Sequence, residues 1–400
     1  MSIPKIYIYG LGVNSAIGLN VSQNWDSLMQ SKTGIGKLEN FVSKRGNLPV
    51  GEIKQSNEEL KNTLSIDDND PTSRTAMLGL LAAKEALEQV ELSEDEIAQM
   101  GFVSATTVGG MSFTEQIWKQ ELDEQETEKL VLAAKVHEAG HHANWIANKL
   151  GIKGYVNSIS TACSSSTNAI IHGANLLKSK KLKHVLVGGS DALSKFTLNG
   201  FQTLMILDEN PSTPFDEDRK GLNLGEGAGY LLLSSDENLK GEKIAELVGY
   251  ANANDAFHQT ASSPEGVGAF LAMKKSLQMA GVTSAEVDYI NVHGTGTEVN
   301  DASEGVAVKR LFEGNSPNFS STKGFTGHTL AACGGIEAVY SILALVNNTL
   351  LPNLRFKNAI KAHGMVPVTS PEKKENMQYA LSNSFGFGGN TSSVLFKKVK

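Results

Sequence analysis

The sequence predicts an α/β protein in which helices pack on sheets. The first observation is that, along the 400 residues, runs typical of buried strands alternate with runs typical of amphipathic helices. The second is the composition, with 40% hydrophobic residues, 20% charged residues and 39 glycines, which is typical of a soluble globular chain. The third is that no window of about 18 apolar residues occurs, so no membrane span is expected.

The predicted strands are short runs rich in β-branched or aromatic residues, bounded by glycine or small polar residues. The first, Ile6 to Tyr9, enters a Gly-rich turn. The run HVLVGGSDA at 184–192 predicts a buried strand that ends in a Gly-Gly turn. Further strands are expected at 101–106, 155–160, 227–235, 242–255 and 289–294, and the runs 379–389 and 392–399 close the chain.

The predicted helices carry apolar residues at helical spacing. The clearest, 75–90, is strongly periodic and has Gly and Ala on its packing face. The others are expected at 24–32, 139–151, 161–180, 270–282 and 335–348. The chain has no low-complexity linker, and the nearest feature to a domain boundary is the polar stretch SSDENLKGEK at 234–243.

Two parts of the chain repeat the same order of features. YVNSIS leads into small residues, Cys163 and a helix, and NFSSTKG leads into small residues, Cys333 and a helix. HVLVGGSDA and YINVHGTGT also match, as a strand, a turn and small polar residues. The pattern predicts a duplicated α/β unit.

Charge, cysteine content and the N-terminus exclude several classes of protein. The formal net charge of −7 argues against a nucleic-acid binder, which is normally basic. Only two cysteines, Cys163 and Cys333, occur, so a disulfide scaffold is excluded and a reducing cytoplasm is expected. The opening MSIPKIYIYGLGVNS lacks a long apolar run behind positive charges and predicts no signal peptide.

The stretch VHEAGHHANW contains His137, Glu138 and His141 in the spacing of a zinc protease. Such a site needs a third protein ligand, yet the chain has no Asp or Glu from 142 to 190. Gly140 inside the pattern weakens a helix by ~1 kcal/mol relative to Ala. We therefore favour an amphipathic helix that Gly151 ends over a zinc site.

The segment STACSSSTNAI places Cys163 between a predicted strand and a predicted helix. Unpaired N–H groups at a helix N-terminus carry partial positive charge and stabilise a thiolate, which can lower a cysteine pKa into the ~3.5–7.5 range. The alternative is a buried cysteine used as a small apolar residue. For Cys163 the surroundings leave both interpretations open, whereas for Cys333 we adopt the apolar one.

Three other segments carry candidate chemistry. His293 follows a strand in YINVHGTGTEVND, and SSTKGFTGHTLAACGGIEA holds Lys323, His328 and Glu337. A single histidine after a strand is usually structural, but two histidines together with Cys163 form a Cys-His-His set. The loop SNSFGFGGN is Gly-rich, but it lacks the strand and helix context of a phosphate-binding loop.

Taken together, the motifs resemble the β-ketoacyl-acyl-carrier-protein synthases, the decarboxylating condensing enzymes of fatty-acid and polyketide synthesis. The resemblance runs nearly end to end, through GLGVNSAIG, TACSSS, TPFDEDRKGLNLGEGAG, VHGTGTEVND, STKGFTGHTLAACGGIEA and SNSFGFGGN. It implies the thiolase fold, with duplicated α/β halves in a five-layer αβαβα arrangement, usually as a homodimer. The halves would be 1–237, with the nucleophile, and 238–400, with the two histidines.

The resemblance also implies roles for individual residues. Cys163 would accept the acyl chain as a thioester, and its backbone N–H would form an oxyanion hole with that of Phe387, the gating aromatic. His293 and His328 would assist decarboxylation of the malonyl group. Lys323 would pair with Glu337 and keep the surroundings of His328 in order. Thr295 and Thr297 match the threonines that hold the pantetheine arm.

No metal or redox cofactor is implied, since substrates would arrive on the phosphopantetheine of an acyl carrier protein. Two departures leave the pathway open between housekeeping lipid, polyketide and aryl-polyene-type pigment. TACSSS is more usual in polyketide-type and pigment-type relatives, and Asn390-Thr391 exchanges two residues that relatives carry in the other order. In addition, the segment 207–210 lacks an arginine that some relatives use to dock the carrier protein.

Three alternatives to a condensing enzyme remain for comparison. A non-catalytic partner subunit that sets chain length usually lacks the nucleophile, which this chain retains. A thiolase uses a second catalytic cysteine and a different histidine arrangement. The third is the zinc hydrolase that the missing ligand disfavours.

Docking of an acidic carrier protein to this acidic chain requires a local basic patch. The candidates are Lys44, Arg45 and Arg74. The run Lys178, Lys180, Lys181 and Lys183 is another, although we favour a solvated helix end for it.

Val108, in TTVGGM, matches a family position that limits acyl length across the dimer interface. Its modest size leaves room for medium or long chains. We therefore expect Val108→Phe to shorten the range of acyl chains, and acyl-chain profiling against the wild type measures this. An unchanged product range would count against the assignment.

Overall fold

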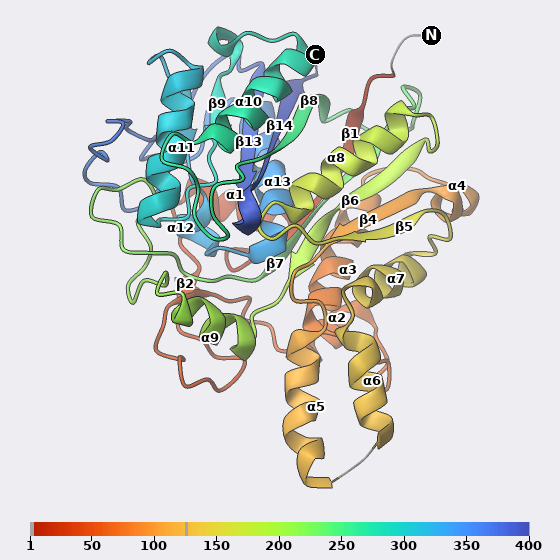
Figure 1. Ribbon diagram of the computed structural model, residues 1–400. Coiled ribbons are helices and arrows are strands. Elements are labelled where there is room, and N and C mark those ends of the chain that lie inside the picture. Colours follow the sequence, from red (N-terminus) through yellow and green to blue (C-terminus); the bar gives the residue numbers. More distant parts are fainter. Residues whose placement is uncertain (1–3, 125–126, 400) are drawn as a thin grey trace.

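The computed structural model describes residues 4–124 and 127–399. Within them, the main sheet is mixed and has the strand order β10-β9-β13-β14-β8-β1-β7-β6-β4-β5 (Figure 1). Its strands are β1 (Tyr7–Ser15), β4 (Gly101–Ala105), β5 (Val156–Ile159), β6 (His184–Asp191), β7 (Gly227–Ser234), β8 (Ala245–Asn254), β9 (Tyr289–Asn291), β10 (Asn318–Ser320), β13 (Tyr379–Phe385) and β14 (Asn390–Lys398). Two short ladders pair β2 (Ile35–Gly36) with β3 (Val50–Gly51) and β11 (Thr349–Leu350) with β12 (Glu372–Lys373).

Helices cover both faces of this sheet. They are α1 (Val21–Met29), α2 (Asn57–Leu64), α3 (Arg74–Leu87), α4 (Glu94–Gln99), α5 (Met111–Glu124), α6 (Thr127–His137), α7 (Ala139–Leu150), α8 (Ser165–Lys178), α9 (Lys195–Thr203), α10 (Val267–Ala280), α11 (Glu298–Leu311), α12 (Lys323–Thr326) and α13 (Cys333–Val346). Three 3₁₀ turns are η1 (Ser284–Glu286), η2 (Leu330–Ala332) and η3 (Phe387–Gly389).

The sheet consists of two halves with the same internal order. The order β1-β7-β6-β4-β5 in the first half corresponds to β8-β14-β13-β9-β10 in the second. In each half the first two pairings are antiparallel and the last two are parallel. The halves meet where Tyr7 and Ile8 of β1 pair with Glu246 and Ala245 of β8. The prediction of a duplicated α/β unit is confirmed.

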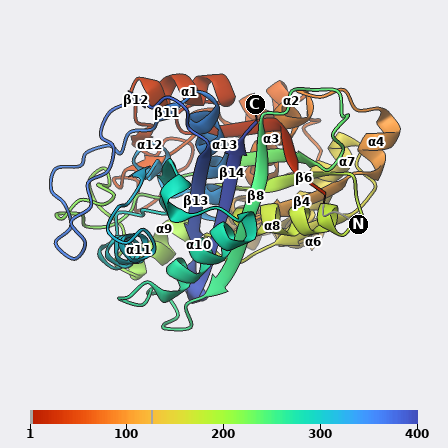
Figure 2. The same cartoon turned by 90° about the horizontal axis from the view of Figure 1, so that it is seen from above.

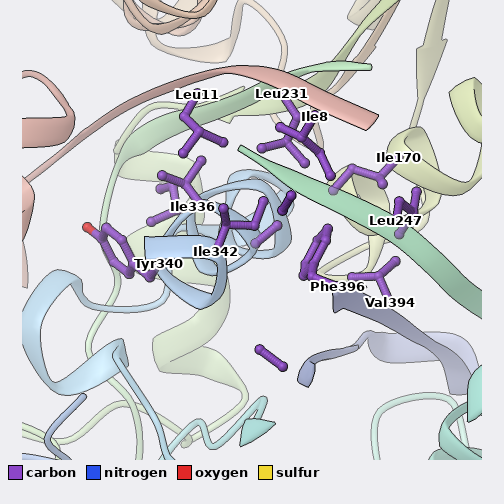
Figure 3. Packing of buried hydrophobic residues seen from close by; sticks show 14 of the residues in the cluster. Ile8, Leu11, Ile170, Leu231, Leu247, Ile336, Tyr340, Ile342, Val394 and Phe396 are labelled. Carbon is purple, nitrogen blue, oxygen red and sulfur yellow. The ribbon is translucent and has the colours of Figure 1, made fainter. Parts of the chain in front are cut away.

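The half-sheets and helices form five layers. α8 and α13 lie between the half-sheets, α3 and α7 cover the outer face of the first half, and α10 and α11 cover that of the second (Figures 1 and 2). In the central core, Ile336 and Ile342 of α13 pack among apolar side chains from both halves, including Leu231 and Phe396 (Figure 3). The five-layer αβαβα prediction is therefore confirmed.

One of the two sequence repeats is correct and the other is wrong. β5 with α8 holds the same place in the first half as β10 with α13 in the second. HVLVGGSDA forms β6, however, whose counterpart is β13, whereas YINVHGTGT contains β9, the counterpart of β4. A strand followed by small polar residues is a local pattern, so it does not distinguish one position in the sheet from the next.

The glycines in β1 and β6 lie inside the strands and form no turns, contrary to the prediction. β1 continues to Ser15 and β6 to Asp191. A Cβ atom at Gly12 would lie 1.8 Å from the carbonyl oxygen of Ala82 in α3, and one at Gly188 would lie 2.1 Å from that of Gly229. Glycine is needed at these positions because backbone segments approach closely.

All six predicted helices are present, but the sequence pattern missed others. α11 buries Asp301, Ser303 and Glu304 next to Ala307 and Val308, so apolar residues alone do not mark its inner face for a periodicity argument. The α5–α6 hairpin, which was also missed, projects from the body of the molecule (Figure 1). Over residues 4–124 and 127–399, no helix has both the length and the apolar character needed to cross a bilayer.

Arg74 is buried, and its proposed role in docking a carrier protein is wrong. Only 6% of its surface is exposed, and its Nη2 lies 2.8 Å from Oε1 of Glu226. The guanidinium also donates to the carbonyl oxygens of Ile53 and Gln55. The sequence did not reveal this burial because Glu226 is 152 residues away in the chain.

We expect Arg74→Met to lower the free energy of unfolding by roughly 3–5 kcal/mol, because it leaves Glu226 buried without its partner. Urea denaturation followed by circular dichroism measures the change. Lys84→Met, at an exposed position of the same helix, is the control and should change stability by less than about 0.5 kcal/mol. Equal effects of the two substitutions would contradict the structural role of the ion pair.

Candidate active site

Cys163 lies at a sharp turn between β5 and α8. Ala162 adopts a left-handed conformation with φ 53°, which is strained for a residue with a Cβ atom. Ser165 holds this turn, because its hydroxyl donates to the carbonyl oxygen of Ala162 at 2.5 Å and accepts from the N–H of Thr161 at 2.8 Å. Ser164 donates to the carbonyl oxygen of Thr161 at 2.8 Å. Two of the serines that follow Cys163 therefore support the backbone that presents the thiol.

Ser166 connects this turn to the second half of the molecule. Its hydroxyl donates to the carbonyl oxygen of Ala331 at 2.5 Å and accepts from the N–H of Gly335 at 2.8 Å. Cys333 is buried, as predicted, but its thiol also donates to the carbonyl oxygen of Cys163 at 3.2 Å. The N-terminal ends of α8 and α13 are thus held together beside the nucleophile candidate.

Of the two interpretations that the sequence leaves open for Cys163, the structure favours a buried neutral thiol over a thiolate stabilised by the helix terminus. Burial raises the pKa of the Cys163 thiol to about 11, although the charge of Lys323 and the backbone N–H groups of Cys163 and Phe387 act in the opposite direction. The helix terminus is therefore outweighed by desolvation, since only 7% of Cys163 is exposed. The two N–H groups that reach the sulfur are those predicted for the oxyanion hole.

His293 is held at the end of β9 by its backbone. Its N–H donates to Oε1 of Glu304 at 2.8 Å, and the next N–H, of Gly294, donates to Oε2 at 2.9 Å. The carbonyl oxygen of His293 accepts from Nζ of Lys323 at 2.5 Å. Glu304 was not among the candidates from the sequence. The only feature that could have indicated it is its position as a charged residue on a helix after a Gly/Thr loop.

Lys323 pairs with Glu337, as predicted, with Nζ 2.5 Å from Oε1. Its other hydrogen bonds reach His293, since Nζ lies 3.3 Å from Nδ1 of that ring. The expectation that Lys323 orders the surroundings of His328 therefore needs correction, because its direct contacts are with His293. An ammonium group only donates, so Nδ1 of His293 accepts and the proton of a neutral ring lies on Nε2.

His328 is fixed by a different set of contacts. Its N–H donates to the carbonyl oxygen of Asn223 at 2.7 Å, and its carbonyl oxygen accepts from the N–H of Gly225 at 2.9 Å. These contacts give the motif TPFDEDRKGLNLGEGAG a structural function. The N–H of Leu330 donates to Nδ1 of His328 at 3.1 Å, so the proton of this neutral ring also lies on Nε2.

The surroundings of both imidazoles favour the uncharged form. Burial, followed by the charge of Lys323, holds the pKa values of His293 and His328 well below their usual range. The ring centroids are 5.4 Å apart and the rings are nearly perpendicular, at 85°. The arrangement therefore offers two neutral N–H donors close to one thiol, which suits a developing negative charge on oxygen.

The thiol and the two imidazoles of this cluster are also common ligands of metal ions. One ligand atom from each of Cys163, His293 and His328 lies within 4.8 Å of the others. A metal would need the unprotonated Nε2 of each ring, however, and both Nδ1 atoms already accept hydrogen bonds from Lys323 and Leu330. The residues present therefore fit a pair of hydrogen-bond donors better than a metal site.

The thiol and both rings line a cavity of about 410 Å³. Its lining also includes Thr295, Thr297 and Phe387, the residues predicted for the pantetheine arm and the gate. The hydroxyls of Thr295 and Thr297 lie 2.9 Å apart. Phe387 is half-buried and stacks on Phe201, with ring centroids 6.0 Å apart at 22°. The glycine after it, Gly388, has φ 78°, a conformation that glycine adopts without strain.

Val108 lies next to this cavity but is not part of its lining. It packs in an apolar cluster with Leu198, Leu222 and Leu330. Leu222 also lines the cavity, so the two regions share a wall. The role of Val108 in limiting acyl length stays a prediction.

The zinc-protease pattern does not form a single helix. α6 ends at His137 and α7 begins at Ala139, so the break falls inside the pattern and its two histidines do not share a helical face. His137, Glu138 and His141 belong to none of the metal-competent groups found among the described residues. The helix over 139–151 has the predicted form, with Gly151 as its left-handed cap.

The remaining docking candidates lie on the surface. Lys44 and Arg45 are exposed in the loop before β3. Lys178 lies over the ring of Tyr250, with Nζ 4.6 Å from the centroid. Lys180, Lys181 and Lys183 are exposed at the C-terminal end of α8, as expected for a solvated helix end.

Comparison with known families gives two matches that together cover most of the chain. Residues 4–239 match the family described as beta-ketoacyl synthase, N-terminal domain, and residues 244–357 match beta-ketoacyl synthase, C-terminal domain. The chain is 32% identical to 3-oxoacyl-[acyl-carrier-protein] synthase 2 of Vibrio cholerae, over 100% of both chains. It is 30% identical to the protein of the same name from Staphylococcus aureus, over 99% of each.

Solved structures show the same similarity. A ketosynthase, ApeO, in complex with its chain length factor, ApeC, from Xenorhabdus doucetiae is 30% identical, with a TM-score of 0.85 over 99% of this chain and 98% of that chain. The ishigamide ketosynthase/chain length factor has a TM-score of 0.92 over 100% of both chains at 24% identity, a likeness of fold.

The raised pKa of Cys163 predicts a specific pH dependence of alkylation. Because the thiolate is the nucleophile, we expect the rate with iodoacetamide to rise about tenfold per pH unit from pH 7 towards pH 10, without a plateau. Mass spectrometry of the modified peptide measures this rate, and Cys163→Ser corrects for any reaction at Cys333. A plateau near pH 7 would show that the thiol is already ionised.

Proposed function

This chain belongs to the beta-ketoacyl synthase family, and we propose that Cys163, His293 and His328 together perform its reaction. That reaction is the decarboxylative condensation of malonyl-acyl-carrier-protein with an enzyme-bound acyl thioester, in fatty-acid or polyketide-type chain elongation. The enzyme is thus a condensing acyltransferase. The observation that supports these roles most directly is that two imidazole Nε2–H donors and one thiol meet in a single cavity.

Acyl transfer to Cys163 comes first. The sulfur attacks the carbonyl carbon of the incoming acyl thioester, and the N–H groups of Cys163 and Phe387 donate to the oxyanion that forms. The carbon–sulfur bond to pantetheine then breaks, and the proton that Cys163 loses ends on the departing pantetheine thiol. A protonated resting thiol is compatible with this exchange because the reaction neither gains nor loses a proton.

Decarboxylation of the malonyl thioester follows. Loss of carbon dioxide leaves an enolate whose negative charge develops on the thioester oxygen, and the Nε2–H groups of His293 and His328 donate to that oxygen. Because both rings are neutral and buried, their hydrogen bonds act in a site of low polarity, where they are stronger than in water. The enolate carbon then attacks the acyl carbonyl on Cys163, and the released thiolate takes up one proton.

Substrate delivery depends on the cavity and its mouth. Thr295 and Thr297 provide hydroxyl groups for the amides of a phosphopantetheine arm, and Phe387 stacks on Phe201 where it can control access. The partner is an acyl carrier protein, as the names of the relatives indicate. The chemistry requires no further cofactor, because the donors and the nucleophile all come from the chain.

The two halves, 1–237 and 238–400, share the chemistry between them. The first half contributes Cys163 and the second contributes both histidines, and the two family matches cover residues 4–239 and 244–357. We propose a homodimer, since the described part of the main sheet ends in two edge strands, β5 and β10, that each pair on one side and leave the other side for a second copy. The ketosynthase ApeO is instead in complex with a chain length factor. The two unpaired cysteines are compatible with the cytoplasm.

Incubation with malonyl- and acyl-carrier protein tests the function, with carbon dioxide and ketoacyl product as readouts. We expect Cys163→Ala to abolish acylation and His328→Ala to lower decarboxylation by about 10²–10³, the effect of removing one oxyanion donor. Lys153→Ala, at an exposed position outside the cavity lining, is the control and should retain the wild-type rate.

A wild-type protein that binds acyl-carrier protein yet releases no carbon dioxide would contradict the proposed activity. It would favour the alternative of a non-catalytic subunit that sets chain length. Condensation that persists in Cys163→Ala would instead contradict the role of the thiol.

A further inference from the structure

Asp191, the last residue of β6, is a fully buried carboxylate to which no catalytic role has been given above. It is surrounded by hydrogen-bond donors from two parts of the chain that are distant in sequence. On one side are the residues that follow β4, and on the other is the turn that follows His328. Burial raises the pKa of Asp191, and the hydrogen bonds from these donors oppose that rise.

The contacts on the first side come from Thr106, Thr107 and Val108. Both hydroxyls donate to the carboxylate, that of Thr107 to Oδ2 at 2.6 Å. The N–H of Thr107 lies 3.1 Å from Oδ1 and 3.2 Å from Oδ2, and the N–H of Val108 lies 3.2 Å from Oδ1. Asp191 therefore fixes the backbone that carries Val108 beside the cavity.

The contact on the second side comes from the turn whose N–H group determines the tautomer of His328. The N–H of Ala331 donates to Oδ2 of Asp191 at 2.8 Å. The preceding residue, Leu330, donates its own N–H to Nδ1 of His328. Leu330 has φ 53°, a strained conformation for a residue with a side chain, which persists only where the surroundings hold it.

We propose that Asp191 is a positioning residue that holds the strained turn at Leu330 and so keeps the proton of His328 on Nε2. The bond from Ala331 fixes the peptide next to Leu330, and the bonds from Thr107 and Val108 fix the carboxylate itself. Without the carboxylate the turn can relax, the N–H of Leu330 leaves Nδ1, and the ring populates both tautomers. The donor aimed at the thioester oxygen would then be present only part of the time.

The site requires a carboxylate and not its amide. Each oxygen of Asp191 accepts from at least one backbone N–H, Oδ1 from Val108 and Oδ2 from Ala331. An asparagine would place its NH₂ group against one of these donors in either orientation. Asp191→Asn therefore keeps the size of the side chain and removes the interaction.

The test uses the ¹⁵N signals of histidine side chains in the full-length protein without substrate, with His328→Gln to assign the signal. We expect a single Nε2–H tautomer for His328 in the wild type and a mixture in Asp191→Asn, with decarboxylation lowered about tenfold or more at an unchanged KM. The matched control is Glu52→Gln. Glu52 is also buried and accepts the N–H groups of Glu39 and Asn40, but it is not in the lining of the cavity. The control should keep both the tautomer and the rate.

Either of two results with the variants would overturn the proposal. One is an unchanged His328 tautomer in folded Asp191→Asn, and the other is an equal change in Glu52→Gln. The unmodified protein gives a test that does not depend on folding of a variant, because the amides of Leu330 and Ala331 should exchange slowly with solvent, and rapid exchange would also overturn it. The proposal rests on the donor role of His328 in the proposed function. The tautomer is measured without turnover, however, so a failed tautomer test can be told apart from a failed condensation assay.

Discussion

The active site depends on a single buried ammonium group, whose charge adds to the effect of desolvation on the neighbouring titratable groups. Lys323 is 1% exposed and directs its three N–H groups to Glu337, to the carbonyl oxygen of His293 and to Nδ1 of the same ring. A charge at this depth is tolerated only when it is fully paired, and Glu337 on the central helix α13 provides the partner. The positive charge in turn disfavours protonation of both imidazoles. The imidazoles of His293 and His328 are therefore favoured as neutral hydrogen-bond donors, and they lie near an ammonium group whose charge is paired with Glu337.

The duplicated architecture explains why the thiol of Cys163 and the two imidazoles meet. α8 and α13 occupy equivalent places in the two halves and lie side by side in the central layer, and their N-terminal ends are joined by Ser166. Two strained residues, Ala162 and Leu330, lie at the entrances to these helices. Hydrogen bonds from both halves maintain the strain, so that neither half forms the site by itself.

Much of the fold and several features of the site could be predicted from the sequence, because they depend on local patterns. Alternating strand-like and helix-like runs indicated helices packed on sheets, the resemblance to a known family implied the five layers, and a cysteine between a strand and a helix indicated the nucleophile candidate. The correspondence of β5 and α8 with β10 and α13 was visible for the same reason. Buried polar helices such as α11 were not, since a periodicity argument relies on apolar residues to mark the inner face.

The sequence by itself indicated the alternation of strands and helices and the candidate residues Cys163, His293 and His328, and its resemblance to a known family implied that Lys323 pairs with Glu337. Only the tertiary structure decided that burial raises the pKa of the Cys163 thiol, that Arg74 is buried and that Lys323 contacts His293 and not His328. The physical reason is the same in each case. Desolvation and hydrogen bonding depend on which distant segments pack around a group, and a local sequence pattern does not show which segments these are.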